Sequence, residues 1–355
     1  MVLSFDVSYA AWRKTVELFS EQENKARFKY NIVPNLFKIK NEFNDGTFKP
    51  GKLRTQIVYF PKKRIVQVPA IRDKILQHCI CDNYLTERLT KPLIKETCAC
   101  VQERGTDYAS DILKTQLRSY YRAHGSTFYV LKCDIKSYFA SIPHWRVKEL
   151  INRYVDDESV KDIVFKFIDT LDVGLPLGLQ QSQLIANLYL ADLDHKCKEL
   201  LGAKYYGRYM DDFYIVSDDR EFLEKCLEYI EAYVRSIGLT LNPKTGIFSN
   251  KLDFVGFTYY LTDTGKVVKL ITKSKKRSKR RHIQKMIRQI DGGLLTVEKF
   301  VESYQGWRAH ALQGDCATLV NIWDSVVIDV CAERNYVLTF NGNKVVLKCL
   351  ELCNN

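Results

Sequence analysis

The sequence predicts an α+β protein in which two strand segments lie among long helical stretches. The first strand segment, residues 128–133, is rich in β-branched and aromatic side chains and ends at Asp134, which is typical of a buried strand. The second, residues 205–217, has the pattern of two strands joined by a turn. The length of 355 residues allows two or three packed subdomains, and 46% hydrophobic and 27% charged residues are ordinary for a folded soluble protein.

The part of the chain before the first strand is expected to be mainly helical and to contain one hairpin. Apolar side chains recur there at helical spacing, and turn residues at 44–46 and 50–51 interrupt them. Apolar and β-branched residues on each side of Pro61-Lys-Lys63 predict two strands around a turn. One or two helices are expected within 8–40 and further helices at 70–90 and 107–123, and the expected strands are at 53–60 and 64–68.

The second half of the chain alternates helices with short strands. The run KSKKRSKRR at 273–281, with seven basic residues in nine, precedes a helical stretch to about 315. Residues 336–347 have the pattern of a hairpin with a tight turn at Asn341-Gly-Asn343. The other expected helices are 144–153, 158–171, 180–201 and 219–237, and further short strands are expected at 239–241, at 248 and at 254–260.

The chain is strongly basic, with a formal net charge of +12 and a pI of about 9.0. A surplus of this size indicates a polyanionic partner, of which nucleic acid is the commonest, although a merely basic soluble protein would have the same composition. No apolar run reaches the roughly 18 residues that a membrane span needs, and the first residues do not have the pattern of a signal peptide. We therefore expect a cytoplasmic protein without a membrane partner.

Eleven cysteines are scattered along the chain. Cys79-Ile-Cys81 and Cys98-Ala-Cys100 are CxC pairs, and the wider CxxC spacing that is typical of structural zinc sites does not occur. In a cytosolic protein these residues are expected to be reduced thiols rather than disulfides or zinc ligands.

The strongest chemical signal is a pair of adjacent acids in the turn of the second strand segment. Asp211 and Asp212 stand within YYGRYMDDFYIV, so apolar strands flank both carboxylates. Two such charges repel each other unless a divalent cation compensates them. The simpler interpretation is a polar hairpin turn, because Asp is common in turns.

A third acid, Asp134, ends the first strand in LKCDIKSYFASIPH. It could cap a helix, since Asp is a favoured N-cap, or it could face a site, and the two roles are compatible. With the other two acids it predicts a metal centre, because two-metal phosphoryl transfer needs carboxylates from different chain segments. We expect Asp134 and Asp211 to contact both ions, and Asp212 to be an outer or single-ion ligand.

Several motifs, in their order along the chain, resemble those of prokaryotic reverse transcriptases. The strand-Asp motif of that family corresponds to LKCDIKSYF, its Gly-rich loop and helix to GLPLGLQQSQLIANLYLADLD, and its catalytic hairpin to YMDD. LNPKTGIF and DFVGF resemble its fourth and fifth palm motifs. KRIVQVPAIRDKILQHCI and ETCACVQERGTDYA resemble finger motifs, and GWRAHALQGDC resembles a thumb segment. The resemblance covers residues 45–317 and rests on the ordered set rather than on any one motif.

The resemblance implies a right-hand polymerase fold, with fingers, a palm of antiparallel sheet backed by helices, and a helical thumb. The N-terminal region and fingers would comprise 1–126, and the palm with the catalytic site 127–260, of which 140–175 would belong partly to the fingers. The basic segment and thumb would comprise 261–320. The tail, 321–355, has no counterpart in the family.

The resemblance also implies roles in catalysis. Asp134, Asp211 and Asp212 match the catalytic carboxylates, which hold two Mg2+ ions, for which Mn2+ can substitute. The backbone of Ile135 is expected to be a further metal ligand. Lys244 matches a basic residue that protonates the leaving pyrophosphate, and an exposed surface lysine is the simpler interpretation.

Four residues match positions around the incoming nucleotide and the nascent base pair. Phe139 matches the position under the sugar, where an aromatic ring clashes with a 2′-hydroxyl and so favours dNTPs; core packing is the alternative. Gly178 and the pair Ser182–Gln183 match the loop and helix that support the nascent base pair.

Basic residues of the fingers are candidates for the triphosphate, because cations there would neutralise developing charge. They are Lys63, Arg64 and Arg72, and Arg104 is a further finger candidate. A solvated finger surface explains these residues nearly as well.

The primer and template are expected to contact two later segments. Phe254, Gly256 and Phe257 match a hairpin that grips the primer end. The basic run at 273–281 is expected to follow the duplex backbone through non-specific, salt-sensitive phosphate contacts, with a nuclear-localisation signal as the alternative. Its candidate residues are Lys275, Arg277 and Arg280.

The Gly-rich loop indicates which subgroup of reverse transcriptases the chain resembles. Group II intron and retron enzymes usually carry Gln before the loop glycine and Ser-Pro after it, whereas this chain has Leu177 and Ser182-Gln183. The pattern resembles reverse transcriptases of diversity-generating retroelements, in which the missing Gln accompanies relaxed fidelity. Those of antiphage defence systems are the alternative, because GLQQSQ departs from the usual GNLTSQ-like segment. Both imply a dedicated structured RNA template, a DNA or RNA primer and dNTPs, and an accessory protein encoded nearby is a further candidate partner.

Two other classes of function stay open at this point. One is a non-catalytic nucleic-acid-binding protein that kept a polymerase fold; the intact acids argue against it, because unneeded carboxylates near bound phosphates would weaken binding. The other is an RNA-templated RNA polymerase. Phe139 argues against it, because such an enzyme needs room for the 2′-hydroxyl.

Overall fold

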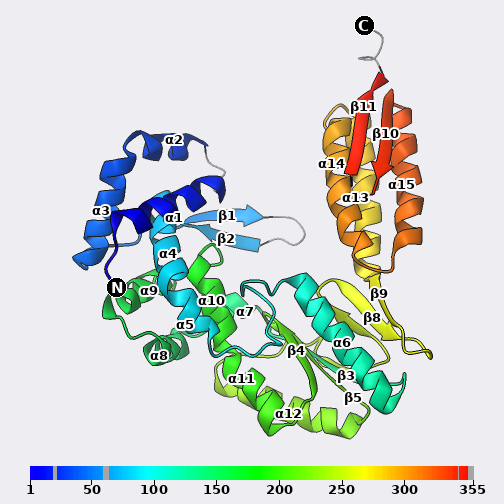
Figure 1. The fold of residues 1–355 in the computed structure, drawn as a ribbon, viewed down its shortest axis with the longest axis horizontal. Helices are drawn as coiled ribbons and strands as arrows, with labels where there is room; N and C mark the ends of the chain where they lie inside the picture. Colours follow the sequence, from blue (N-terminus) through cyan, green and yellow to red (C-terminus); the bar gives the residue numbers. More distant parts are fainter. Residues whose placement is uncertain (19–21, 59–63, 343, 351–355) are drawn as a thin grey trace. The chain divides into compact units, whose positions relative to one another are not determined.

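The computed structural model describes residues 1–18, 22–58, 64–342 and 344–350. The chain forms two compact units (Figure 1). The first unit comprises Met1–Leu113 and Val130–Ile247, and the second comprises Lys114–Tyr129 and Phe248–Asn355. Each unit is therefore built from two separate stretches of chain, and α6 (Thr106–His124) begins in the first and ends in the second.

Three helices open the first unit, where the sequence predicted one or two within residues 8–40. They are α1 (Phe5–Leu18), α2 (Gln22–Tyr30) and α3 (Ile32–Asn44). α1 packs on α4 (Ile71–Ile80) and buries Ala11 and Trp12. Phe5 stacks on Phe37 of α3 with ring centroids 4.9 Å apart, so the helices pack through aromatic contacts.

The expected hairpin follows these helices. β1 (Arg54–Val58) pairs antiparallel with β2 (Arg64–Val68), and both strands are largely exposed. The predicted turn at 61–63, and the last two residues of the predicted first strand, lie outside the described residues. The helical prediction for 70–90 is confirmed by α4, the π-helix η1 (Cys81–Leu85) and α5 (Thr86–Thr90).

A four-stranded sheet of order β4-β5-β3-β6 is the framework of the first unit. β3 (Tyr129–Asp134) is the strand that was predicted to end at Asp134. β4 (Tyr205–Tyr209) and β5 (Asp212–Ser217) pair antiparallel around a two-residue turn, and β6 (Gly246–Ser249) lies on the other side of β3. β3 and β5 are neighbours, and Lys132 near the end of β3 contacts Asp212 at the start of β5, so these two strand ends lie together.

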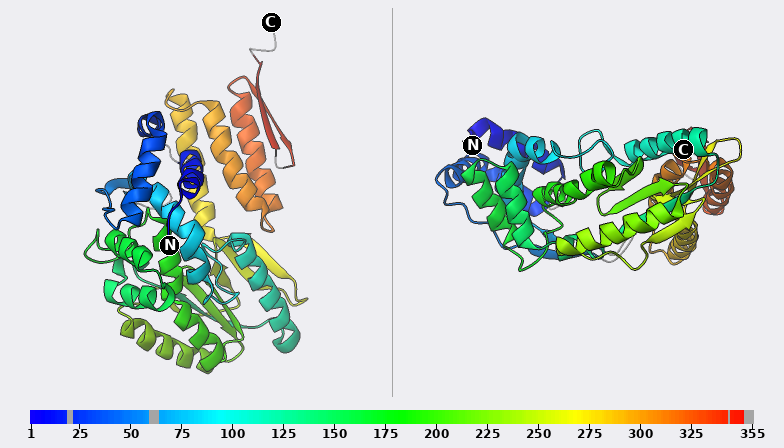
Figure 2. Two further views of the ribbon diagram at one scale, coloured as in Figure 1. Left: turned by 60° about the vertical axis from the view of Figure 1, so that its left-hand side comes forward. Right: turned by 90° about the horizontal axis from the view of Figure 1, so that it is seen from below.

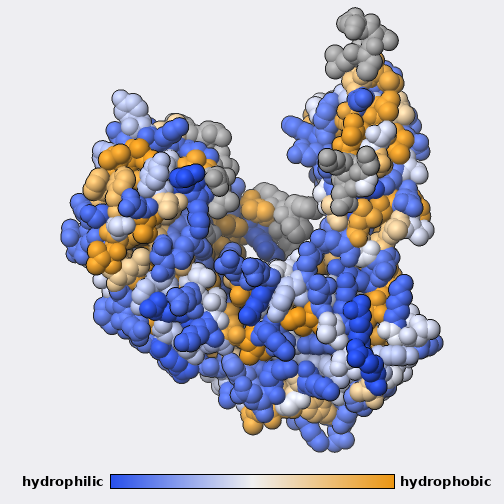
Figure 3. Space-filling model, in the orientation of Figure 1, coloured by the Kyte–Doolittle hydropathy of each residue, from blue (hydrophilic) through white to orange (hydrophobic). Residues whose placement is uncertain are grey.

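Helices pack against this sheet. α12 (Arg220–Ser236) packs on β5 and buries Leu223, Cys226, Ile230 and Val234, which follow helical spacing. The visible faces of α6 and α12 are mostly hydrophilic (Figure 3), as expected for helices with one buried side. The predicted helices 144–153 and 158–171 are present as α8 (His144–Tyr154) and α9 (Glu158–Ile168).

The prediction of one continuous helix over 180–201 is wrong. The structure has α10 (Gln180–Tyr189), α11 (Ala191–His195) and the π-helix η2 (Lys196–Leu200). Leu190 separates the first two with φ −101° and ψ 5°, outside the α-helical region. All but two residues of α10 are buried, so packing on several sides, rather than a Gly or Pro, sets its end.

The second unit combines a small sheet with a helical bundle. The sheet, of order β7-β8-β9, is antiparallel and consists of β7 (Leu252–Phe254), β8 (Phe257–Leu261) and β9 (Val267–Ile271), of which β9 was not predicted. Three helices lie side by side (Figures 1 and 2): α13 (Lys273–Asp291), α14 (Val297–Leu312) and α15 (Ala317–Ala332). The predicted terminal hairpin is present as β10 (Tyr336–Asn341) and β11 (Lys344–Cys349).

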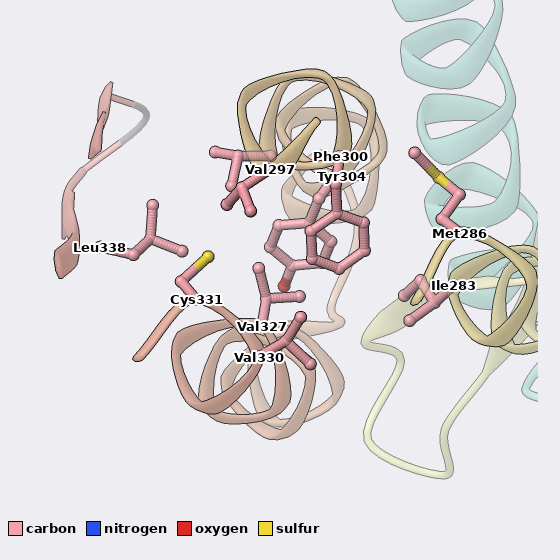
Figure 4. Packing of buried hydrophobic residues seen from close by; sticks show 10 residues of the cluster. Ile283, Met286, Val297, Phe300, Tyr304, Val327, Val330, Cys331 and Leu338 are labelled. Carbon is pink, nitrogen blue, oxygen red and sulfur yellow. The ribbon is translucent and has the colours of Figure 1, made fainter. Parts of the chain in front are cut away.

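The bundle has its own apolar core, to which the end of the chain contributes (Figure 4). Phe300 and Tyr304 of α14 pack between Val327 of α15 and Met286 of α13, and Leu338 of β10 joins the same cluster. The described part of 321–355, a segment for which the sequence suggested no role, therefore contributes to this core. Apolar side chains also line the visible side of the β10–β11 hairpin (Figure 3). Within the described parts of the chain, no helix is both long and apolar enough to cross a membrane.

Candidate active site

Three carboxylates from neighbouring strands lie together at one end of the four-stranded sheet. Asp134 is the last residue of β3, Asp211 lies in the turn after β4, and Asp212 begins β5. The carboxyl groups of Asp134 and Asp211 are near enough to hydrogen-bond when one of them is protonated. The structure therefore brings together the acids that the sequence singled out from two separate segments.

The neighbouring carboxylates of this cluster repel one another, and this repulsion affects the pKa of Asp211. Burial is the largest cause that raises the pKa of Asp211, to about 6, and the carboxylates of Asp134 and Asp212 raise it further against a backbone hydrogen bond that lowers it. A raised pKa of this origin indicates a place where a cation would be favourable. All the donors are oxygens, which suits Mg2+, an ion commonly held by one or two carboxylates plus substrate phosphates.

The protein offers a metal ion a pair of carboxylates rather than a complete set of ligands. Across the described stretches of the chain, no group of three or more His, Cys, Asp or Glu side chains is arranged to hold a metal ion. Asp134 and Asp211 are the pair in contact, and Asp212 is directed to a lysine. Because Mg2+ retains waters and accepts phosphate oxygens, the pair is sufficient as the protein's share of such a site.

Asp134 is held in place by a loop of which the sequence analysis used only Lys244. The side-chain amide of Asn242 donates to Oδ2 of Asp134 at 2.9 Å, and the Asn242 backbone N–H donates to the Asp134 carbonyl at 2.7 Å. The Asp134 backbone N–H in turn donates to Oγ1 of Thr245 at 3.4 Å. Asn and Thr within LNPKTGIF were the available signal, since both can bond a nearby carboxylate or backbone group.

Asp212 is paired with Lys132, which the sequence analysis also missed. The ammonium of Lys132 contacts Oδ1 of Asp212, and the lysine side chain is only 17% exposed. Alternation along β3 places Lys132 on the same face as Asp134, two residues later. That alternation was the signal that could have included Lys132 in the predicted site.

The turn that carries Asp211 has an unusual backbone. Met210 has φ 60°, in the left-handed region that non-glycine residues seldom occupy. The Nη1 of Arg208 donates to the Met210 carbonyl at 2.9 Å. Arg208 is fully buried, and a charged residue within the apolar run before YMDD was its signal in the sequence.

Phe139 follows Asp134 closely in the chain and is held through its backbone. It stands on the short helix α7 (Tyr138–Ser141) with its ring half-buried, and its carbonyl accepts from the Leu175 N–H at 2.7 Å. A Cβ at Gly174, which has φ 84°, would lie 2.7 Å from the same carbonyl. The partly open ring is compatible with a sugar contact and with packing.

The Gly-rich loop lies directly against the β1–β2 hairpin. A Cβ at Gly178 would lie 1.8 Å from the carbonyl oxygen of Gln67 in β2, so only glycine fits. The side-chain oxygen of Gln67 also accepts from the Leu177 N–H at 3.2 Å. Gln183 is exposed on the first turn of α10 and accepts from the thiol of Cys100 at 3.5 Å.

The structure does not bring all the predicted phosphate-binding residues to the carboxylates. Lys63 lies outside the described residues, and Arg64 is exposed at the start of β2. Arg72 pairs with Glu42, and its guanidinium lies 4.1 Å from the ring centroid of Phe48. These contacts give Arg72 a structural partner in the N-terminal part of the unit.

Two further basic candidates have different surroundings. Arg104 donates to the backbone carbonyls of Ile94 at 2.8 Å and Thr97 at 3.5 Å, so it ties its own loop together. Lys244 is exposed, and its backbone N–H donates to Asn242 at 3.1 Å. Lys244 is therefore in the loop that holds Asp134.

The predicted primer-contacting residues all lie in the second unit. Phe254 and Phe257 are buried and flank the two-residue turn Val255–Gly256 between β7 and β8. A Cβ at Gly256 would lie 1.9 Å from the Nζ of Lys275, which also lies 3.2 Å from the ring nitrogen of His310. Arg277 and Arg280 are exposed on α13.

The fold and the acidic site together define a nucleic-acid polymerase with a palm-like sheet. The chain belongs to the reverse transcriptase (RNA-dependent DNA polymerase) family, whose model matches residues 50–259. The enzyme class of this family is RNA-directed DNA polymerase, a nucleotidyltransferase. The predicted likeness to prokaryotic reverse transcriptases and the α+β, right-hand fold class are both confirmed.

Curated relatives match part of the chain. The group II intron-encoded protein LtrA of Lactococcus lactis subsp. cremoris is 26% identical over 172 residues, which cover 44% of this chain and 27% of LtrA. The retron Ec73 reverse transcriptase of Escherichia coli is 23% identical over 203 residues, which cover 54% of this chain and 57% of the retron protein. The match thus spans less than two thirds of either relative.

Solved structures that match part of this chain include two telomerases. Apo telomerase from Candida tropicalis, truncated from its C-terminal domain, has a TM-score of 0.49 and 15% identity, and the match covers 61% of this chain and 55% of that one. Telomerase from Candida albicans in complex with a TWJ fragment of telomeric RNA has a TM-score of 0.49 and 13% identity, covering 63% and 46%.

Proposed function

We propose that this chain is an RNA-directed DNA polymerase that adds dNTPs to a primer 3′-hydroxyl at the carboxylates Asp134, Asp211 and Asp212. The observation that carries the proposal is the contact between Asp134 and Asp211, at the end of one strand and in the turn before its neighbour, in a chain of the reverse transcriptase family. Acids from separate segments whose carboxyl groups lie within hydrogen-bonding reach are suited to divalent cations.

The proposed cofactor is a pair of Mg2+ ions, for which Mn2+ can substitute. Asp134 and Asp211 would hold them, with Asp212 and the backbone carbonyl of Ile135 as further ligands. When bound, the ions would activate the attacking 3′-hydroxyl and neutralise the leaving pyrophosphate. The protein's own part is to orient these oxygens, which Asn242 does for Asp134.

Around the carboxylates, other residues would select and hold the nucleotide. Phe139 is proposed to exclude a 2′-hydroxyl, which its half-buried ring on the short helix after Asp134 supports. Gly178 and Gln183 are proposed to support the nascent base pair. This role agrees with the tight packing of the Gly178 loop on Gln67 and with the exposed position of Gln183.

Positive charges are proposed to bind the phosphates. Lys63, Arg64 and Arg72 remain candidates for the triphosphate; the exposed Arg64 is free of the contacts that hold Arg72 to Glu42 and Phe48. Lys244 remains the candidate that protonates the pyrophosphate. Its exposed position in the loop that bonds Asp134 supports this role.

The second unit is proposed to hold the primer and template. The turn at Gly256, with the ammonium of Lys275 against it, would contact the primer end, while Phe254 and Phe257 support the turn from within. The exposed Arg277 and Arg280 on α13 would contact duplex phosphates. Such contacts carry no sequence information and weaken with salt.

For the biological role, we propose a diversity-generating retroelement with a dedicated structured RNA template. The loop residue Leu177, where a Gln would be usual, supports relaxed fidelity. A role in antiphage defence is the alternative. The genes beside this one separate the two: a pair of variable repeats would favour diversification, and a toxin-like effector or a defence cluster would favour immunity. Both roles place the enzyme in the cytoplasm.

The test is primer extension on an RNA template with labelled dNTPs and Mg2+, comparing wild type with Asp211→Asn. The substitution removes one charge at nearly constant shape, so a loss of activity reports on metal chemistry rather than on folding. We expect wild type to extend the primer and the variant to be inactive. An Asp211→Asn enzyme as active as wild type would contradict the proposed site. Wild type that copies only its co-purified RNA would identify a dedicated template.

A further inference from the structure

A buried ionic network lies directly beneath the turn that carries the catalytic acids. At its centre are Arg208 of β4 and Asp194 of α11, both fully buried. The Nε and Nη2 of Arg208 donate to the two carboxylate oxygens of Asp194 at 2.7 Å and 2.6 Å, a bidentate pair. A buried ion pair of this kind gives little net stability compared with apolar packing, so its presence invites another explanation.

Every donor and acceptor of this pair is satisfied. A guanidinium has five N–H groups, and the three that do not bond Asp194 reach Asn187 Oδ1 at 3.3 Å, the Asn187 carbonyl at 3.0 Å and the Met210 carbonyl at 2.9 Å. Asp194 also accepts from the hydroxyl of Thr97 at 2.8 Å and from the hydroxyl of Tyr206. A fully satisfied network in a low-dielectric interior is rigid.

The network joins chain segments that the proposed mechanism treats separately. Asn187 belongs to α10, the helix that begins with the residues proposed to support the nascent base pair. Thr97 belongs to a loop that lies along the free edge of β4, where the Glu96 carbonyl accepts from the Arg208 N–H at 3.0 Å. Arg208 is therefore the common partner of the catalytic turn, the α10 helix and this edge loop.

The network reaches the proposed metal-binding residues through the carbonyl of Met210, which precedes Asp211. Met210 is held at φ 60° immediately before Asp211, and such a conformation persists only where surrounding contacts over-determine it. The Arg208 Nη1 holds the carbonyl of this residue. Fixing the Met210–Asp211 peptide fixes the direction in which the Asp211 carboxylate leaves the turn.

We propose that Arg208, held by Asp194, is a positioning residue for the catalytic carboxylates: through the Met210 carbonyl it keeps Asp211 aligned with Asp134. Arg208 touches neither substrate nor metal in this role. The inference rests on the proposed function, because it assumes that Asp211 and Asp134 are the metal-binding pair. It adds that the geometry of this pair is set from beneath, by a buried charge in the preceding strand.

The test uses two variants that avoid leaving a buried charge without its partner. Asp194→Asn/Arg208→Gln removes both charges together and keeps hydrogen-bonding groups at both positions. Arg208→Lys keeps the ion pair, but a single ammonium cannot serve Asp194, Asn187 and the Met210 carbonyl at once. If the double variant does not fold, the lysine variant still decides the question.

The second unit contains a matched control network. Arg308 donates to Asp324 at 3.0 Å, Tyr304 donates to the same carboxylate at 2.6 Å, and Arg308 holds the Gly342 carbonyl at 2.7 Å. All three side chains are buried. Asp324→Asn/Arg308→Gln therefore removes an equivalent Arg–Asp–Tyr arrangement that has no link to the carboxylates.

The main measurement is Mn2+ binding to the substrate-free protein by electron paramagnetic resonance, alongside thermal unfolding and primer extension. We expect both Arg208 variants to bind Mn2+ about 10-fold more weakly and to lose about 10- to 100-fold in kcat, with little change in KM for dNTP. The Asp324 control should bind Mn2+ as wild type does. Recovery of kcat at high Mn2+ would support misalignment rather than unfolding.

Several outcomes would overturn the inference. One is an Arg208→Lys protein with wild-type Mn2+ affinity and kcat. Another is an equal loss in the Arg208 and Asp324 variants, which would make Arg208 a purely structural residue. Asp211→Asn separates this inference from the proposed function. If that variant retains activity, the metal site itself is misassigned; if it is inactive while Arg208→Lys is normal, only the positioning role fails.

Discussion

The ammonium of Lys132 pairs with Asp212, while Asp134, two residues further along the same strand, contacts Asp211. The three acids are therefore not equivalent. Asp212 is already neutralised by the Lys132 ammonium, whereas the carboxylates of Asp134 and Asp211 repel each other. This division agrees with the expectation that Asp134 and Asp211 are the main ligands and that Asp212 is a lesser one.

Removing Lys132 should strengthen divalent cation binding. Its ammonium competes for Asp212 and repels an incoming ion, so Lys132→Met should lower the Mn2+ dissociation constant by about 3- to 5-fold, an effect limited by the partial exposure of the pair. Titration of the substrate-free protein with Mn2+ measures this change. Lys161→Met is the control, because Lys161 is similarly shielded and pairs with Glu158 at 2.7 Å on α9. Unchanged or weaker binding in Lys132→Met would show that the lysine supports the site.

The stability of the metal-free protein should depend on the ionisation of Asp211. Its pKa in the folded state is raised to about 6 from 3.8, so the folded state retains a proton that the unfolded state has released. The contribution of Asp211 to stability is thus greatest below pH 4 and is lost as the pH rises through 6. Asp211→Asn should raise Tm at pH 8 in EDTA by about 2–4 °C, and by less at pH 5.

The same variant should lose its response to metal. Mg2+ is expected to stabilise the wild-type protein at pH 8 and to leave Asp211→Asn nearly unchanged, because binding to the folded state is what raises Tm. Asp162→Asn, at a carboxylate 2.6 Å from Lys166 on α9, is the control and should respond to Mg2+ as wild type does. Equal Mg2+ stabilisation of both variants would count against a metal site at Asp211.

Sugar selection should depend on the ring of Phe139. Phe139→Ala should raise the efficiency of rNTP incorporation relative to dNTP by about 10- to 100-fold, because the clash with the 2′-hydroxyl is removed. Single-nucleotide extension with matched dNTP and rNTP measures the ratio. Phe165→Ala, at a half-buried ring on α9, should leave the ratio unchanged. A ratio that stays at the wild-type value in Phe139→Ala would favour plain packing for this ring.

The Gly256 turn should be sensitive to a single methyl group. An added Cβ would lie 1.9 Å from the Nζ of Lys275 and would displace it. Gly256→Ala should weaken primer–template binding by about fivefold, which is the contribution of one exposed ionic contact. The slope of log affinity against log salt concentration should fall by about 1, as for the loss of one phosphate contact. Gly293→Ala is matched for backbone strain, because Gly293 has φ 68° and open space around it. Similar losses in both variants would point to strain alone.

The parts of the site that sequence could predict are those that local pattern determines. The buried strand before Asp134 and the two acids between apolar runs follow from side-chain type within about ten residues. The partners of these acids could not be predicted in the same way. Asn242 reaches Asp134 from 108 positions away, and Thr97 reaches Asp194 from 97 positions away, so only the folded chain brings them together.

The sequence analysis predicted no helix at α15, and the reason is different. Its sequence contains many Val and Ile residues, which favour strands locally. In the structure Val327, Val330 and Cys331 pack against α14 and the terminal hairpin. Burial of that face outweighs the local preference, and tertiary packing of this kind is not visible in a window of sequence.

The interleaving of the two units has a consequence for the synthesis of this protein. Residues 114–129 belong to the second unit, yet the remainder of that unit begins only at Phe248. As the chain leaves the ribosome, the end of α6 and the start of β3 must therefore wait, without their native neighbours, while the whole central stretch is translated. A chain cut short near Ile247 would keep Asp134, Asp211 and Asp212 but leave residues 114–129 without the rest of their unit, so the first unit is a poor candidate for independent expression.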